Sequence, residues 1–335
     1  MSWEAIRGHD AIVRSFDAAW RKGRLGHAYL FVGPPGVGKH RFARELAKAL
    51  LCEAPKDRLA ACSKCGSCIL ADAGTHPDLH LAGRPEDKVE LPIEIIRELV
   101  EHLSLKPARG GRKVAILDNA DDLNAESANA FLKVLEEPPP GSVLILIGGP
   151  TPDRQLPTVQ SRCQGVTFLP LRKNDLIAVV KDHGITDASR LDRLVRVADG
   201  SPRQALALDD ESLWTFRKAL LEALAAERVD CFVLAEAWNH FVEDAGKEAG
   251  VKRRRAALVL RLLLGMLQDA QRVANGVRPL VADREEAAML GKLADRLGPE
   301  KLADWVDRAI AADVQIDRKV QIDLIIEAFS DYLGR

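Results

Sequence analysis

The sequence has few aromatic residues and no excess of charge of either sign. Phe, Trp and Tyr make up only 5% of its 335 residues, which disfavours a surface on which nucleic-acid bases stack. Lys and Arg number 48 and Asp and Glu 49, so the formal net charge is −1. Binding of nucleic acid by overall charge is therefore excluded, and any contact with DNA must use a local patch or a partner's surface.

Long apolar runs are also missing. The longest near-continuous run, residues 256–267, is interrupted by Arg261 and Gly265, whereas a membrane span needs about 18 or more apolar residues. We therefore expect a buried helix here and no contact with a membrane. The first residues lack the apolar core of a signal peptide, and the chain has only 6 cysteines. These features favour a cytoplasmic protein with a metal site over a disulfide-bonded secreted one.

Short apolar runs predict buried strands in the first half of the chain, at residues 28–32, 114–117 and 143–147. Apolar residues at helical spacing lie between them, and Asn124 and Pro138 are placed to begin and end one helix. Strands that alternate with helices predict a parallel α/β sheet. After about residue 170 the strand signals stop and helical patterns take over. We therefore expect three domains, at 1–168 (α/β, with an insertion at about 52–76), 169–207 (small, helical) and 208–335 (all-α).

A glycine-rich segment follows the first predicted strand and has the pattern of a phosphate-binding loop. It covers residues 33–40, with Gly33 and Gly38 as glycines that let backbone N–H groups approach phosphate. Lys39 would reach the outer phosphates. The last position normally holds Ser or Thr, whose hydroxyl binds Mg²⁺, and His40 is a poor substitute. The pattern predicts descent from a phosphate loop and leaves open whether ATP still binds weakly or not at all.

A second part of an ATPase site is also missing. Asp118 ends the next strand, where phosphate-loop enzymes place the carboxylate that holds Mg²⁺. Asn119 follows, where a glutamate base would normally stand, and an amide cannot act as a base. Asp121 and Asp122 are interpreted as solvated loop carboxylates. The loss of both the hydroxyl and the base predicts a chain that no longer hydrolyses ATP.

Four cysteines have the spacing of a metal site. Cys62, Cys65 and Cys68 form a C-x-x-C-x-x-C run, and Cys52 precedes it. Four thiolates can close a tetrahedral Zn²⁺ site without an open position, which predicts a structural role. An iron–sulfur cluster of the ferredoxin type would need a cysteine four residues after Cys68, where Asp72 stands, and metal-free thiols are the remaining alternative.

Taken in order, these motifs resemble the AAA+ subunits of the bacterial replicative clamp loader. The most specific are the cysteine insertion inside the phosphate-loop domain, Leu-Glu-Glu-Pro-Pro at 135–139 and Ser-Arg-Cys at 161–163. The resemblance covers about the first 207 residues by motif and the rest by helical pattern. Because two parts of the ATP site are missing, the chain is more similar to the family's non-hydrolysing members than to its ATP-hydrolysing ones.

The resemblance implies an AAA+ parallel-sheet domain with a zinc insertion, a small helical lid domain and an all-α collar domain through which subunits assemble. It implies that Arg162 reaches into the ATP site of a neighbouring subunit as an arginine finger, and that Arg203 contacts nucleotide from the lid. The implied partners are the gamma/tau and delta subunits of the clamp loader. The sliding clamp and primed DNA are reached through the assembled complex.

Two other functions stay open. One is a working ATPase of the gamma/tau type, which Ser or Thr at position 40 and Glu at position 119 would favour. The other is a zinc-dependent nucleic-acid-binding module, which the balanced charge and low aromatic content disfavour. ATP turnover and salt-dependent DNA binding by the isolated chain distinguish these alternatives from the first.

Overall fold

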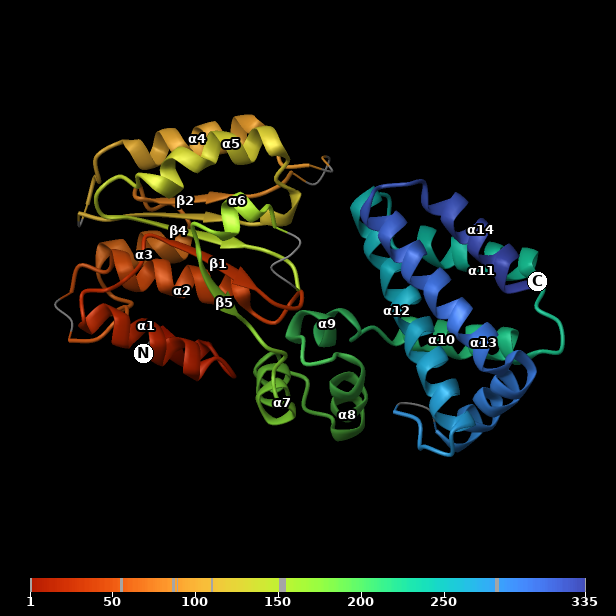
Figure 1. Ribbon diagram of the computed structural model, residues 1–335. Helices are drawn as coiled ribbons and strands as arrows, with labels where there is room; N and C mark the ends of the chain where they lie inside the picture. Colours follow the sequence, from red (N-terminus) through yellow and green to blue (C-terminus); the bar gives the residue numbers. More distant parts are fainter. Residues whose placement is uncertain are drawn as a thin grey trace. The chain divides into compact units, whose positions relative to one another are not determined.

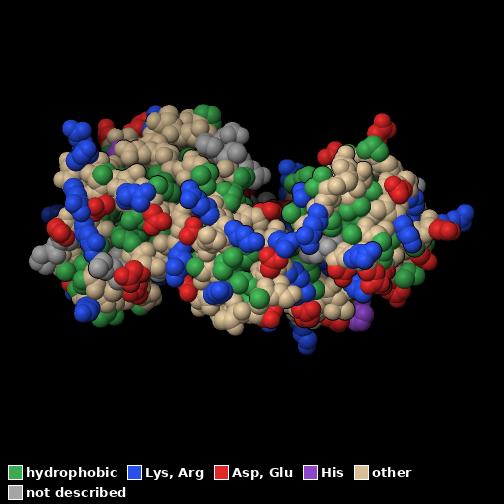
Figure 2. Space-filling model, turned by 90° about the horizontal axis from the view of Figure 1, so that it is seen from below, with side chains coloured by type: hydrophobic (Ala, Val, Ile, Leu, Met, Phe, Trp, Pro, Cys, Tyr) green, Lys and Arg blue, Asp and Glu red, His purple; other side chains and the backbone are tan. Residues whose placement is uncertain are grey.

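The computed structural model describes residues 2–54, 57–85, 88, 90–109, 111–150, 155–280 and 283–334. The chain divides into two compact units, one made of Met1–Thr186 with Asp199–Gln204 and the other of Asp187–Ala198 with Ala205–Arg335. None of the described helices is long and apolar enough to cross a membrane. Figure 2 shows Lys and Arg side chains interspersed with Asp and Glu over the face seen from below, in keeping with the balanced composition.

The first unit is built on a five-stranded parallel sheet of order β2-β3-β4-β1-β5. The predicted strands are confirmed to within a residue as β1 (Ala28–Val32), β3 (Lys113–Leu117) and β4 (Ser142–Ile147), and every residue in them is buried. Such continuous burial is expected of inner strands that are covered on both faces. The sequence did not predict the edge strands β2 (Leu79–Ala82) and β5 (Gln164–Thr167).

Helices cover both faces of this sheet (Figure 1). One layer holds α4 (Ile93–Ser104) and α5 (Ala125–Glu136), and the other holds α1 (Asp10–Arg21), α2 (Lys39–Leu51) and α3 (Gly66–Ala73). The shorter helical segments are η1 (Ser2–Ala5), η2 (Ala120–Asp122), α6 (Pro157–Gln160), α7 (Lys173–Asp182) and α9 (Pro202–Ala207).

Local signals set the ends of α5 as the sequence predicts. The Asn124 side chain accepts a hydrogen bond from the Ser127 N–H at 2.9 Å, which caps the first turn. The helix ends at Glu136, just before Pro138, because a proline ring cannot continue it. Its inner face contributes Phe131 and Leu135 to the core between the helices and the sheet.

The described residues of the second unit form helices and connecting loops. The helices are α8 (Ala188–Val197), α10 (Glu211–Ala225), α11 (Cys231–Glu243), α12 (Ala249–Ala274), α13 (Arg284–Asp317) and α14 (Ile322–Gly334). The apolar run at 256–267 lies inside α12, where most of it is buried, as expected. α13 is broken at Gly298, which has a φ of 71° and is followed by Pro299.

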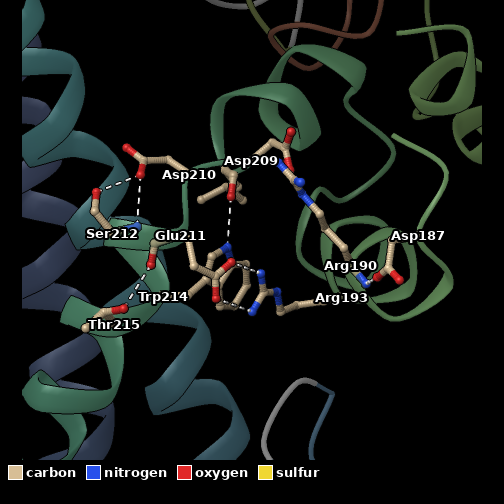
Figure 3. Close-up of polar contacts among 10 residues, drawn as sticks. Asp187, Arg190, Arg193, Asp209, Asp210, Glu211, Ser212, Trp214 and Thr215 are labelled. Atoms are coloured by element: carbon tan, nitrogen blue, oxygen red, sulfur yellow. Dashed lines mark hydrogen bonds and ion pairs between the residues drawn. The ribbon is translucent and has the colours of Figure 1, made fainter. Parts of the chain in front are cut away.

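Arginines fix α8 to α10 within the second unit (Figure 3). Arg193 pairs with Glu211 at 2.8 Å, and its guanidinium lies 4.3 Å from the centre of the Trp214 ring. Arg190 pairs with Asp209, in the segment just before α10. α8 thus packs with the C-terminal helices, and the division into three domains at about 169 and 208 stays a prediction.

Candidate functional site

The phosphate-loop segment lies between β1 and α2, at the end of an inner strand. Gly33 follows β1 directly, and Gly38 caps α2 with a φ of +108°, a conformation that favours glycine. The structure therefore places the predicted residues in the strand–loop–helix arrangement that phosphate binding requires.

Lys39 is bound by the loop itself. Its Nζ donates to the backbone carbonyls of Gly33 and, at 2.8 Å, of Pro34. The residue is only 7% exposed. Burial lowers the pKa of Lys39, against the opposing effect of the carboxylates of Asp118 and Asp121. The ammonium group expected to meet phosphate is thus hydrogen-bonded inside its own loop.

His40 lies against the carboxylate expected to hold Mg²⁺. Its Nδ1 is 3.3 Å from Oδ2 of Asp118, and both side chains are half exposed. Burial would raise the pKa of Asp118, but hydrogen bonds from His40 and from the Asn119 N–H hold it below its ordinary value. The imidazole of His40 therefore pairs with the carboxylate that the sequence assigned to Mg²⁺.

A segment far along the chain packs on the same loop. Ser201 Oγ donates to the Pro35 carbonyl at 3.0 Å, and the Arg203 N–H donates to the Gly36 carbonyl at 3.4 Å. A Cβ at Gly36 would lie 2.4 Å from Ser201 Oγ and 2.7 Å from the Arg203 Cβ, so only glycine fits there. The structure brings the backbone of Arg203 to the loop and leaves its side chain exposed.

His9 also contacts the loop, although the sequence did not single it out. It is 5% exposed, its Nε2 lies 2.8 Å from the Val37 carbonyl, and its ring meets that of Phe168 edge-on at 4.9 Å. A lone histidine before a helix carries no sequence signal for this position. With this contact, each carbonyl from residue 33 to residue 37 has a partner inside the first unit.

The interpretation of Asp121 and Asp122 as solvated carboxylates was wrong. Asp121 accepts a hydrogen bond from Gln155, and Asp122 pairs with Arg84 at 2.6 Å. Both acids are half-buried, so they hold the loop after β3 in place.

Arg162 follows α6, and its guanidinium is held on the surface of its own unit. Nε donates to Glu136 at 2.8 Å, Nη2 contacts the same carboxylate, and Nη1 donates to the Thr158 carbonyl at 2.9 Å. The Arg162 side chain is 32% exposed. These contacts are with the ends of α5 and α6, and none of them reaches the chain's own phosphate loop.

The four clustered cysteines lie together. Their Sγ atoms are all within 4.8 Å of one another, and those of Cys62 and Cys68 are 3.9 Å apart. Tetrahedral thiolate ligands at about 2.3 Å from zinc lie about 3.8 Å apart, which this cluster matches. The backbone N–H groups of Lys64 and Cys65 lower the pKa of Cys62 to about 6, whereas burial raises the pKa of Cys68. Cys52, Cys62, Cys65 and Cys68 could therefore hold one metal ion.

A polar network joins this cluster to the sheet, and sequence reasoning missed it. Ser67, next to Cys68, donates to Glu53 at 2.9 Å and lies 2.9 Å from His76 Nε2. His76 Nδ1 accepts the Asp78 N–H at 3.0 Å. The buried carboxylate of Asp78 then accepts the N–H groups of residues 108 and 109, each at 2.7 Å. The insertion and the loop before β3 are thus coupled through buried polar groups.

The parallel sheet with a glycine-rich loop between β1 and α2 defines a phosphate-loop α/β protein. A sequence profile of the family described as "DNA polymerase III, delta subunit" matches residues 8–172. The DNA polymerase III subunit delta' of Escherichia coli is 30% identical over 299 residues, which cover 89% of this chain and 83% of that protein. That of Pseudomonas aeruginosa is 36% identical over 217 residues, which cover 64% of this chain and 66% of that protein.

The chain therefore belongs to the family of DNA polymerase III delta' subunits, within the clamp-loader group. Among solved structures, a DNA polymerase III gamma subunit-related protein of Thermotoga maritima is 16% identical, with a TM-score of 0.46. That match covers 98% of this chain and 100% of the other, and similarity at this level carries no argument about function.

Proposed function

We propose that this chain is a non-hydrolysing AAA+ subunit of the bacterial replicative clamp loader, with a zinc insertion, a helical lid and a helical collar. The observation that carries the proposal is the pairing of His40 with Asp118 beside the phosphate loop. Lys39 is bound to loop carbonyls, and His40 lies against Asp118. With His40 in place of the hydroxyl that binds Mg²⁺ and Asn119 in place of a base, the isolated chain lacks two groups that ATP hydrolysis uses. It acts as a component of a DNA polymerase complex.

Its contribution to hydrolysis is made on a neighbouring subunit, through Arg162. The planar guanidinium can bind two phosphoryl oxygens at once and carries its charge at any physiological pH. An arginine finger supplied in trans typically accelerates phosphoryl transfer by about 10³–10⁵. A chain that supplies such an arginine to one neighbour and has no ATP-hydrolysing site of its own needs no arginine from a second neighbour. It is therefore suited to one end of an arc of subunits.

The partners in this proposal are the gamma/tau and delta subunits, since the relatives include tau and gamma subunits. The sliding clamp and primed DNA are reached through the assembled complex, in the bacterial cytoplasm. Zinc is the metal we assign to the four cysteines, because four thiolates suit Zn²⁺ and leave no position for substrate. The metal would cross-link the insertion, and Ser67 and Glu53 would hold that insertion in place.

Both alternatives have direct tests. Turnover of ATP by the pure chain that disappears in Lys39→Ala would establish a gamma/tau-type ATPase. A nucleic-acid-binding module would show DNA affinity that falls steeply with salt. The interspersed charges seen in Figure 2 do not favour that function, which needs a clustered basic surface.

The proposed function is tested in an assembly reconstituted with Arg162→Ala or Arg162→Lys. We expect clamp- and DNA-stimulated ATP hydrolysis and clamp loading to fall, with Lys nearly as impaired as Ala because an ammonium lacks the planar fork. The total rate of ATP hydrolysis should fall by a smaller factor than the rate at the affected site, since the other ATP sites keep their own arginine fingers. Arg14→Ala, at an exposed position on α1, is the matched control. Loading at the unmodified rate by both Arg162 variants in intact assemblies would contradict the proposal.

A further inference from the structure

The guanidinium of Arg162 is engaged along two edges by its own subunit. Nε and Nη2 form one edge, and both bond to the same carboxylate oxygen of Glu136. On the other side, Nη1 donates to the Thr158 carbonyl at 2.9 Å and to Ser161 Oγ at 3.1 Å. All three guanidinium nitrogens therefore have partners inside the first unit.

Glu136 is held where it meets Arg162 by the end of α5. It is the last residue of that helix, and the prolines from 138 onward fix the direction of the chain after it. α6 packs beside α5 and presents Arg162 at its own end. Half of the Glu136 side chain is exposed, so the carboxylate contributes little to the core and its clearest contact is with Arg162.

A carboxylate and a phosphoryl group compete for the same edge of a guanidinium. Both offer oxygens in the geometry that the fork of N–H groups recognises, so one edge cannot serve both at once. In the structure the Nε–Nη2 edge is taken by Glu136. Arg162 must therefore leave Glu136 before it can present that edge to phosphate on another subunit.

We propose that Glu136 is a positioning residue that latches Arg162 onto its own subunit until a neighbour's nucleotide displaces it. This inference rests on the proposed function of Arg162 as a finger in trans. The latch makes engagement of the finger depend on a ligand that outcompetes a carboxylate, so an empty neighbouring site leaves the finger withdrawn. Removing the carboxylate should bias Arg162 toward engagement, with the effect on apparent ATP affinity rather than on the chemical step.

The first arm of the test uses the isolated chain and does not depend on any partner. Phenylglyoxal modifies accessible guanidinium groups, and peptide mapping by mass spectrometry gives the rate at Arg162. We expect Glu136→Gln to accelerate that modification about two- to fivefold, the range set by an exposed ion pair. Glu137→Gln is the matched control, because it removes the same charge from the next, exposed residue. Arg7, paired with Asp182 at 3.0 Å, serves as the internal reference.

The second arm uses the reconstituted assembly. With Glu136→Gln, the ATP concentration for half-maximal turnover should fall about two- to fivefold while the maximal rate changes little. Glu137→Gln should match the unmodified assembly in both quantities. A residue that only supported the fold would lower the maximal rate or the yield of assembly without lowering the half-saturating ATP concentration.

The outcomes separate the latch from the function on which it rests. Unchanged modification of Arg162 in Glu136→Gln overturns the latch, and so does equal acceleration by Glu137→Gln. A maximal rate that falls in Glu136→Gln as it does in Arg162→Ala also overturns it, because Glu136 would then present the finger instead of withholding it. If Arg162→Ala itself leaves turnover intact, the proposed finger fails, while the modification rates still decide whether Glu136 holds Arg162.

Discussion

Lys39 is expected to stabilise this chain rather than to bind nucleotide, and Lys39→Met separates the two roles. Methionine keeps the length and apolar stem of the side chain and removes the ammonium group. In a working phosphate loop this change abolishes nucleotide binding and leaves the fold largely intact. Here the reverse is expected, because the ammonium group is bonded to the backbone carbonyls of Gly33 and Pro34.

The magnitude follows from the two carbonyls that lose their donor. A buried polar group left without a partner costs about 1–3 kcal/mol, so two cost about 2–6 kcal/mol. Part of this is offset because the ammonium group is itself costly to bury, as the lowered pKa of Lys39 shows. We expect the free energy of unfolding of the first unit to fall by about 2–4 kcal/mol, a decrease in Tm of about 5–15 °C.

The same contacts set the expectation for nucleotide. To meet phosphate, Lys39 must leave two charge-assisted hydrogen bonds of about 1.5–3 kcal/mol each, which weakens binding by about 10²–10⁴-fold before any new contact forms. A fluorescent ATP analogue titrated to millimolar concentrations, with Mg²⁺ or with EDTA, should show no saturation in either condition. Thermal and urea unfolding measure the stability arm, with exposed Lys133→Met as the control. Micromolar nucleotide binding that Lys39→Met abolishes, or unchanged stability in that variant, would refute the reasoning.

Three further expectations concern other parts of the first unit. Elemental analysis should find one metal ion per chain in the unmodified protein and none in Cys65→Ser. This variant should disorder the insertion at 52–76 and keep the circular dichroism of the sheet. Iron, or no metal in freshly reduced unmodified protein, would contradict the assignment. Asp78→Asn should lower the free energy of unfolding by about 2–4 kcal/mol, because an amide cannot accept hydrogen bonds from both N–H groups that the carboxylate binds. A change below about 0.5 kcal/mol, the usual effect at a surface site, would count against this. Burial raises the pKa of Cys163 to about 12, so iodoacetamide at pH 9 should alkylate it slowly in native protein and fast in urea. The pKa of Cys163 is higher in the folded than in the unfolded chain, so the stability that the neutral thiol provides is present below about pH 8.5 and is lost as the pH rises toward 12. Cys163→Ala should remove this pH dependence of the free energy of unfolding.

The strands that the sequence predicted are the ones whose burial is continuous. β1, β3 and β4 are covered on both faces, so their residues form uninterrupted apolar runs that stand out from the helices around them. The edge strands carry no such signal. β5 reads Gln-Gly-Val-Thr and is largely exposed, and β2 contains a histidine. They are strands because they pair with β1 and β3, and pairing across the sheet is not written in the local sequence.

The candidate site likewise has features that the local sequence predicts and features that depend on tertiary contacts. The absence of a hydroxyl at position 40 and of a carboxylate at position 119 is a matter of residue identity, so the sequence alone is enough to predict that ATP hydrolysis is lost. The direction of Lys39 is a matter of tertiary contact. Ser201 reaches the loop from 166 residues away, and His9 from the segment before α1, so no local pattern could place them. The latch between Glu136 and Arg162 is hidden for the same reason, although both residues lie in motifs that the sequence made conspicuous.

The proposed loss of ATP hydrolysis and the contacts within the phosphate loop are physically linked. In a working site the ammonium of the loop lysine and the carboxylate after β3 face phosphate and Mg²⁺, which balance their charges. If this chain has lost these ligands, as we propose, both groups still need partners, since a charge removed from water without a partner is strongly unfavourable. Here Asp118 meets His40 and Lys39 meets its own loop, so residues of the chain itself supply these partners. Arg162 lies on the surface with its partner Glu136, and an exposed ion pair of this kind contributes only about 0–1 kcal/mol. Moving it costs little, which is the property that a residue acting on another subunit needs.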